Sequence, residues 1–187
     1  NYNSSNSVIL DHPINSIEVD CNDDIWIAYE NGVSKFCNDS MWSYYDTSNS
    51  GLSCNIIYDI DFDSNCNTWF ASPDGAIRQT DSNWTTFNSS NSGLVGNRII
   101  AMEPDQHGGI WFSTEVSGRS GGVTYYNGNS SWVTFTDTTG LISNHINYIE
   151  IDGMGNVWFG SNDYNNPGIT RFNGNNWTSH SMIDTIP

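Results

Sequence analysis

The chain has 187 residues, of which 36% are hydrophobic and 13% aromatic, enough for one domain with a buried core. It carries 21 acidic and 5 basic residues, a net charge of −16. This balance excludes the basic surface that nucleic acid or an anionic membrane requires. No apolar run approaches the roughly 20 residues of a membrane span, so we expect no membrane insertion. The charge suits cations, neutral ligands such as glycans, or a protein partner with a basic surface.

In chain order, residues 1–13 read as the end of an outer strand and a linker, because Tyr2 stands where Tyr45 and Phe87 stand in later units. A repeated unit then begins. Its four copies define the predicted blades: residues 14–55, 56–98, 99–145 and 146–187.

The copies align on tryptophans that are 43, 42 and 47 residues apart: Trp26, Trp69, Trp111 and Trp158. An Asp stands six residues before each Trp, and another acid eight before it. An Ile stands twelve before each: Ile14, Ile57, Ile99 and Ile146. A second Trp follows in every unit: Trp42, Trp84, Trp132 and Trp177. A repeat at this period predicts stacked supersecondary units.

Each unit reads as four short strands, A to D, separated by Gly, Asn, Asp and Pro. In the fourth unit the predicted strands are 146–152, 156–161, 168–173 and 176–180. Such a unit is the blade of a β-propeller. The sequence therefore predicts an all-β chain, a β-propeller made of four-stranded antiparallel blades, with four blades in this chain.

The motifs D-x-x-G-N-V-W-F-G, G-I-T-R-F-N-G and G-L-I-S-N resemble the two-component-regulator propeller repeat, and more distantly the virginiamycin B lyase propellers. The resemblance extends over residues 14–180 and implies a sensor-type propeller that is extracellular or periplasmic. Two units depart from the pattern: Asp23 and Cys66 stand where Gly108 and Gly155 stand in the others.

Whether the ring closes is left open by the sequence. The four blades fit a segment of a larger ring, a half that pairs with a second copy, or a four-bladed ring that closes alone. We favour the incomplete arrangements. An open arrangement exposes a blade face at each end and predicts self-association through these faces.

One face of the propeller is the preferred ligand face, because B–C loops and D–A linkers meet there. The B–C loop is long in blade three (TEVSGRSG) and in blade four (NDYNNP), and function collects on elaborated loops. An alternative is loop-length drift without a ligand. The predicted ligand-binding residues are His12, Asn55, Asn97, Arg98, Glu115, Arg119, Asn144, His145, Asp163 and Tyr164.

The paired acids of strand A form a second candidate site. Residues two apart on a strand point to one side, and carboxylates near the channel could hold Ca²⁺ or Mg²⁺. The alternative is structural: an Asp that ends strand A shapes the A–B turn. We expect either no cofactor or Ca²⁺. The predicted metal ligands are Glu18, Asp20, Asp61, Asp63, Glu103, Asp105, Glu150 and Asp152.

Two further patterns concern single side chains. Lys35, Arg78 and Arg171 share one strand-C position, where Tyr125 stands in blade three, and we expect ion-pair or stacking roles for these cations. Among the cysteines, Cys54 is predicted to lie on the face opposite the other three. At most one disulfide is therefore expected, and Cys21–Cys37 is the preferred pair.

Catalysis finds little support. The related lyases use His and Glu with Mg²⁺ at the propeller centre, but His12, His145 and Glu115 do not occupy matching repeat positions. We predict a non-enzymatic extracytoplasmic module that recognises a ligand such as a glycan, or a protein. The alternatives are a self-assembling surface or filament component, and a lyase of the virginiamycin B type.

Overall fold

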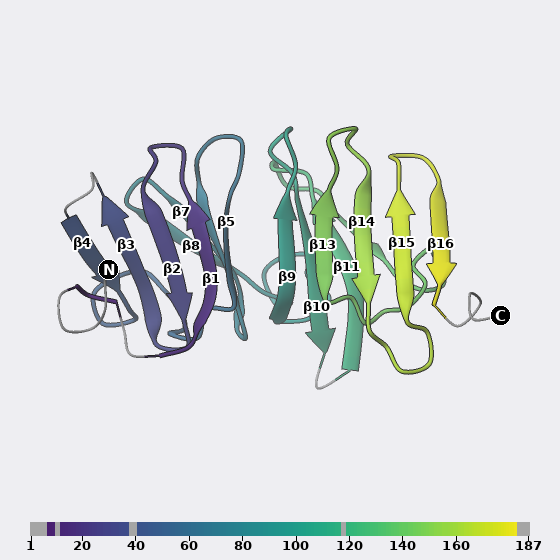
Figure 1. Ribbon diagram of the computed structural model, residues 1–187, viewed down its shortest axis with the longest axis horizontal. Coiled ribbons are helices and arrows are strands. Elements are labelled where there is room, and N and C mark those ends of the chain that lie inside the picture. Colours follow the sequence, from purple (N-terminus) through teal and green to yellow (C-terminus); the bar gives the residue numbers. More distant parts are fainter. Residues whose placement is uncertain (1–6, 10–11, 38–40, 117–118, 183–187) are drawn as a thin grey trace.

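A computed structural model describes residues 7–9, 12–37, 41–116 and 119–182. In these ranges every regular element is a strand, and there is no long apolar helix of the kind that spans a membrane. Sixteen strands form four antiparallel sheets, each joined in chain order (Figure 1). The all-β, four-bladed architecture predicted from the repeat is confirmed.

The strand bounds follow the repeat closely. Blade 1 contains β1 (Ile14–Val19), β2 (Ile25–Tyr29), β3 (Gly32–Cys37) and β4 (Met41–Tyr45). Blade 2 contains β5 (Asp59–Phe62), β6 (Thr68–Ser72), β7 (Gly75–Thr80) and β8 (Asn83–Phe87). Blade 3 contains β9 (Arg98–Pro104), β10 (Ile110–Val116), β11 (Arg119–Tyr126) and β12 (Trp132–Phe135). Blade 4 contains β13 (Tyr148–Ile151), β14 (Val157–Ser161), β15 (Gly168–Phe172) and β16 (Trp177–Ser181).

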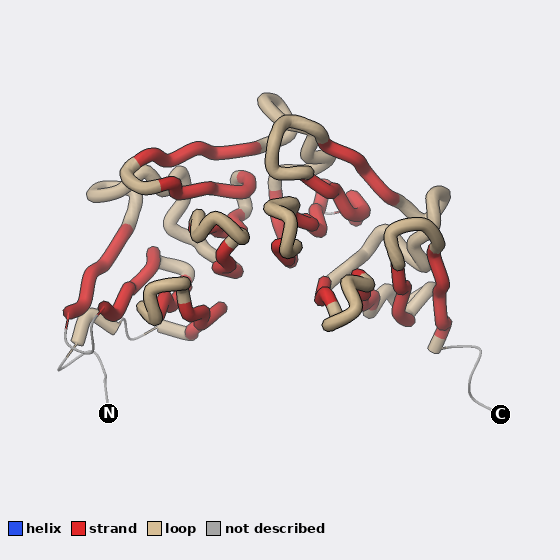
Figure 2. The backbone as a smooth tube through the Cα atoms, turned by 90° about the horizontal axis from the view of Figure 1, so that it is seen from above, coloured by secondary structure: helices blue, strands red, loops and turns tan. Residues whose placement is uncertain are grey.

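The blades form an open arc (Figure 2). The innermost strands β1, β5, β9 and β13 stand side by side around its centre, and blades 1 and 4 lie at opposite ends. The third reading of the sequence, a four-bladed ring closed on itself, is therefore wrong for this arrangement. Blade 1 and blade 4 each present one sheet face that no other described blade covers.

Aromatic residues hold neighbouring blades together. The B-strand Trp of one blade meets the B-strand Phe of the next, with ring centroids 5.9 Å apart for Trp26–Phe70 and 5.4 Å apart for Trp111–Phe159. The three layers between neighbouring blades form the core of the protein. A single blade would leave both faces in water, so the tryptophans stabilise the fold by burial between blades.

The Gly-Leu pair of each linker locks onto the next blade. The Leu is buried in all three linkers, as at Leu52. The Gly lies flat against the D-strand Trp of the following blade, and a Cβ on Gly51 would come within 2.2 Å of the Trp84 ring. Only glycine permits this approach, which explains why the pair recurs.

One predicted loop is a strand pair. Residues 114–121 were expected to be a long B–C loop, but β10 continues to Val116 and β11 begins at Arg119. A bulge lies between Thr114 and Glu115, and the two strands stay paired on both sides of it. Blade 3 therefore projects a hairpin, whereas residues 162–167 of blade 4 remain a loop as predicted.

Candidate functional site

The aspartates that end strand A organise the A–B turns. Asp63 accepts hydrogen bonds from the backbone N–H of Asn65 and Asn67, and from Trp69 Nε1 at 3.0 Å. Asp20 and Asp152 make the equivalent indole contact, each at 2.9 Å. The structural alternative for these aspartates is what the structure shows, because their oxygens already bind protein donors.

The acids two residues earlier gather around the centre of the arc. Burial and the nearby charge of Glu103 raise the pKa of Asp61 to about 8. Burial and Glu150 raise the pKa of Glu103 to about 7. These shifts record like charges held close in a partly dry environment.

Proximity alone does not build a metal site. Within the described ranges, no three His, Cys, Asp or Glu side chains are grouped so that they could hold one ion. The turn aspartates, including Asp105, instead bind backbone and aromatic donors. Ca²⁺ binding by the strand-A acids stays a prediction, and the described side chains form no coordination sphere for it.

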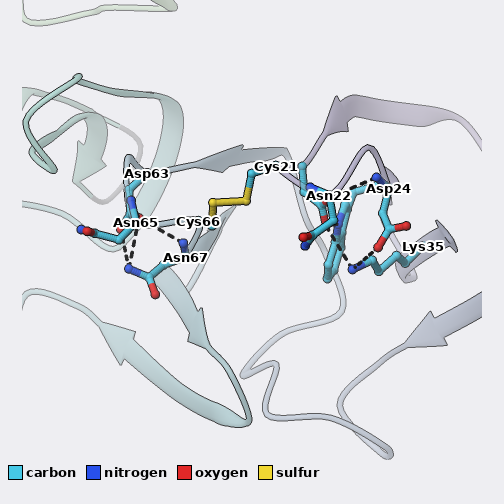
Figure 3. The surroundings of a disulfide bond; sticks show 10 residues. Cys21, Asn22, Asp24, Lys35, Asp63, Asn65, Cys66 and Asn67 are labelled. Atoms are coloured by element: carbon cyan, nitrogen blue, oxygen red, sulfur yellow. Dashed lines mark hydrogen bonds and ion pairs between the residues drawn. A yellow bond between two sulfur atoms is a disulfide. The ribbon is translucent and has the colours of Figure 1, made fainter. Parts of the chain in front are cut away.

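The expected disulfide is wrong in its partner. Cys21 is bonded to Cys66, with Cα atoms 6.1 Å apart (Figure 3). Cys37 and Cys54 are free. The A–B turns of neighbouring blades lie next to each other, so the bond links blade 1 to blade 2. The expectation of a single bond that leaves Cys54 unpaired holds.

Cys66 stands in a turn position that favours glycine. Its φ is 61°, and Asp23 has a φ of 62° at the matching place, where Gly108 and Gly155 have φ values of 84° and 80°. An L-residue in the left-handed region is disfavoured by roughly 1–2 kcal/mol. The disulfide offsets this local cost.

Three of the predicted ligand residues fix the linkers. Asn55 Oδ1 accepts the backbone N–H of Thr47 at 2.8 Å, and Asn97 Oδ1 accepts that of Ser89 at 2.9 Å. Asn144 makes the same bond in the third linker. Their recurrence is explained by the chain reversal between blades.

The predicted ligand face does contain a pocket between blades 2 and 3. Its volume is about 470 Å³, and Asn97, Arg98 and Glu115 line it together with Pro73 and Val116. Arg98 forms an ion pair with Glu115 and lies over the ring of Tyr58. Hydrogen bonds to Tyr58 and Glu115 raise the pKa of the Arg98 guanidinium.

A second pocket on this face belongs to blade 4. It has a volume of about 250 Å³ and is lined by His145, Asn162, Asp163 and Tyr164. The backbone N–H of Asn165 and the hydroxyl of Ser143 donate to Asp163 and lower the pKa of its carboxyl. Tyr164 is 95% exposed. The structure thus brings three predicted residues together beside a solvent-facing aromatic ring.

Among the predicted ligand residues whose side chains the structure describes, Asn55, Asn144 and His12 line neither pocket. His12 is exposed in the segment before β1. Arg119 begins β11, and its side chain lies outside the described part of the structure. Sequence reasoning missed Asn162 and Ser143, which support the second pocket. It also missed a cavity on the opposite face, between blades 3 and 4.

The strand-C cations have the predicted internal roles. Lys35 pairs with Asp20 and Asp24 at 3.1 and 2.9 Å and lies over the Trp26 ring. Arg78 stacks on Trp69 in the same way.

The chain is similar to a known repeat family and to several solved structures. The two-component regulator propeller family matches residues 93–116 and 140–163. The extracellular domain of the hybrid two component system BT3049 from B. thetaiotaomicron is 26% identical, with a TM-score of 0.80. The extracellular domain of the one component system BT4673 from the same organism is 22% identical, with a TM-score of 0.74.

The matches cover a much larger share of this chain than of the solved domains. The matches cover 100% and 94% of this chain but 26% of each of the two domains. Virginiamycin B lyase from Staphylococcus aureus is 16% identical, with a TM-score of 0.67, over 94% of this chain and 58% of the lyase chain, a likeness of fold alone. A search of curated proteins found no match. Residues 93–116 and 140–163 match the two-component regulator propeller repeat that the motifs resemble.

Proposed function

We propose that these two-component regulator propeller repeats form a non-enzymatic, extracytoplasmic module that binds a glycan on the B–C loop and D–A linker face. The carrying observation is Tyr164, which is 95% exposed beside Asp163 and His145 in a loop that the other blades lack. An aromatic face stacks on the apolar face of a sugar ring, while a carboxylate and an amide bind its hydroxyls.

The extracytoplasmic location has two supports. The similar domains of B. thetaiotaomicron are extracellular. The Cys21–Cys66 bond belongs in an oxidising compartment. Sensing follows from the same likeness, since those domains belong to one and two component systems. Lyase activity is not part of the proposal, because Glu115 and His145 line different pockets.

A glycan array followed by titration calorimetry tests the proposal. We expect a neutral glycan to bind, and Tyr164→Ala to weaken its binding at least tenfold. Tyr148→Ala is the matched control, because Tyr148 is also exposed on blade 4 but lies outside the pocket. Absence of any bound glycan, or equal losses in both variants, would refute the proposal.

Self-association is the second candidate function, and a specific observation favours it. Trp26, Trp69 and Trp111 are 3%, 1% and 5% exposed beneath the following blade, whereas Trp158 is only half-buried. Ile169 on the same face is 44% exposed. We propose that a second copy of this chain covers this face of blade 4.

Light scattering over a dilution series tests the second candidate. We expect a dimer or larger particle that Ile169→Glu dissociates. Met154→Glu should have no effect, because Met154 lies in a turn and is 85% exposed. A monomer at every concentration contradicts self-association and leaves glycan binding intact.

A further inference from the structure

A cavity of about 380 Å³ lies between blades 3 and 4, on the face that carries the A–B and C–D turns. Its walls are mainly aromatic and aliphatic. Trp111, Tyr125 and Phe135 come from blade 3, and Ile151 and Phe172 come from blade 4. Polar groups are contributed by the A–B turn of blade 3, including Asp105. The cavity is separate from both pockets of the proposed glycan face.

Small residues on the blade 4 side leave the cavity open. In the layer between blades 1 and 2, Phe62 packs against Trp26 with ring centroids 6.1 Å apart. In the layer between blades 3 and 4, the matching residue is Ile151, which is smaller than Phe and has no ring. Gly155 and Gly174 line the cavity, and a Cβ on either would meet nothing within 4 Å. Side chains that would close the space are therefore missing on the blade 4 side.

The polar pattern changes at the same place. In the other three blades the indole N–H donates to the turn Asp, as Trp69 donates to Asp63. In blade 3 the hydroxyl of Tyr125 donates a hydrogen bond to the turn Asp instead, at 2.7 Å from Asp105 Oδ2. Tyr125 holds the position that a cation holds in the other units.

Trp111 is left with an available donor. Trp111 is 5% exposed, and none of the described residues accepts a hydrogen bond from its Nε1. The atom is nevertheless not among the fully enclosed unpaired polar atoms of the described chain. Water in the cavity can therefore reach this N–H, and a ligand that accepts a hydrogen bond from it replaces that water.

We propose that this cavity binds a small, neutral, planar aromatic molecule that presents a hydrogen-bond acceptor to Trp111. The ring walls select a planar aromatic body. The unpaired indole N–H selects an acceptor rather than a donor. The Asp105 carboxylate and the net charge of −16 disfavour an anion. The volume suits a molecule of about two fused rings.

Coumarin and indole are suitable probes, because both are small, neutral and bicyclic while only coumarin carries a carbonyl acceptor. In titrations followed by NMR, coumarin should bind saturably with one site per chain and more tightly than indole. Trp111→Phe keeps an aromatic ring at this position and removes the N–H. It should weaken coumarin binding about threefold to tenfold, as expected for one hydrogen bond, and leave indole binding almost unchanged.

Two further variants locate the site. Ile151→Phe places the side chain of Phe62 at its matching position, fills the cavity, and should weaken coumarin binding at least tenfold. Trp69→Phe is the matched control, since Trp69 Nε1 is already bonded to Asp63, and coumarin binding should persist. The indole N–H resonance of Trp111, assigned by its loss in Trp111→Phe, should shift when coumarin is added to the unmodified chain. This resonance test does not depend on the folding of any filled variant.

Three outcomes would overturn the proposal: no saturable coumarin binding, an unmoved Trp111 indole resonance, or equal losses in Trp111→Phe and Trp69→Phe. The glycan experiment is independent, because it concerns the opposite face. Either result can fail without the other.

Discussion

Removing the Cys21–Cys66 bond should destabilise the chain strongly. The two residues are 45 apart in sequence, and the loop-closure entropy of such a loop corresponds to about 4 kcal/mol. At about 2–4 °C per kcal/mol for a domain of this size, the melting temperature should fall by about 8–16 °C. Calorimetry and urea unfolding of Cys21→Ser/Cys66→Ser, compared with Cys37→Ser/Cys54→Ser, measure the difference.

The turn conformation adds a second, finer expectation. Because Cys66 has a φ of 61° where blades 3 and 4 use glycine, Cys21→Ser/Cys66→Gly should be about 1 kcal/mol more stable than the double serine variant. Thiol titration of the denatured, unreduced chain should find two thiols rather than four. Four reactive thiols, or a double serine variant that loses less than about 1 kcal/mol, would refute the reasoning.

Three further predictions concern the turns, the centre and the ligand face. Asp63→Ala should lower the free energy of unfolding by about 2–3 kcal/mol, because the buried Trp69 N–H loses its acceptor; the exposed Asp137→Ala is the control, and urea unfolding measures both. Burial and Glu103 raise the pKa of Asp61 to about 8 in the folded chain, so its protonated form favours folding, and stability should fall by a few kcal/mol as the pH rises from about 4 through 8. Unfolding at pH 5, 7 and 9 should show this slope reduced in Asp61→Asn; an unchanged slope contradicts the assignment. Arg98→Ala should change stability by less than about 1 kcal/mol, since the Arg98 side chain is 48% exposed in its ion pair, and a larger loss in urea unfolding would show that the pair supports the fold.

The repeat made the blades predictable because its spacing reports physical contacts. In three blades the B-strand Trp reaches the turn Asp six residues earlier, and in blades 1 to 3 it reaches the Phe of the next blade, as Trp69 reaches Asp63 and Phe112. Both contacts recur with the period of the fold. A sequence pattern that encodes packing in this way predicts strands, turns and blade order together.

Contacts between blades were harder to predict from the sequence. Cys37 is nearer than Cys66 to Cys21 along the chain, and within one blade it lies on the expected face. The bond instead joins the A–B turns of two blades, which depends on how closely neighbouring turns approach. The sequence predicts a loop where β10 and β11 form a hairpin, because residues 117–122 are rich in Gly and Ser. Pairing with β9 instead extends β10 as far as Glu115.

Recurrence and departure separate structure from function in this chain. Asn55 and its equivalents recur, and the linker explains them; the turn aspartates recur, and the indole and backbone bonds explain them. The two ligand-binding proposals depend on departures from the repeat. Tyr164 belongs to a loop found in one blade, and Tyr125 replaces a cation while freeing the Trp111 donor. Because the repeat positions already hold the blades together, we expect ligand recognition at the positions where one blade differs from the others.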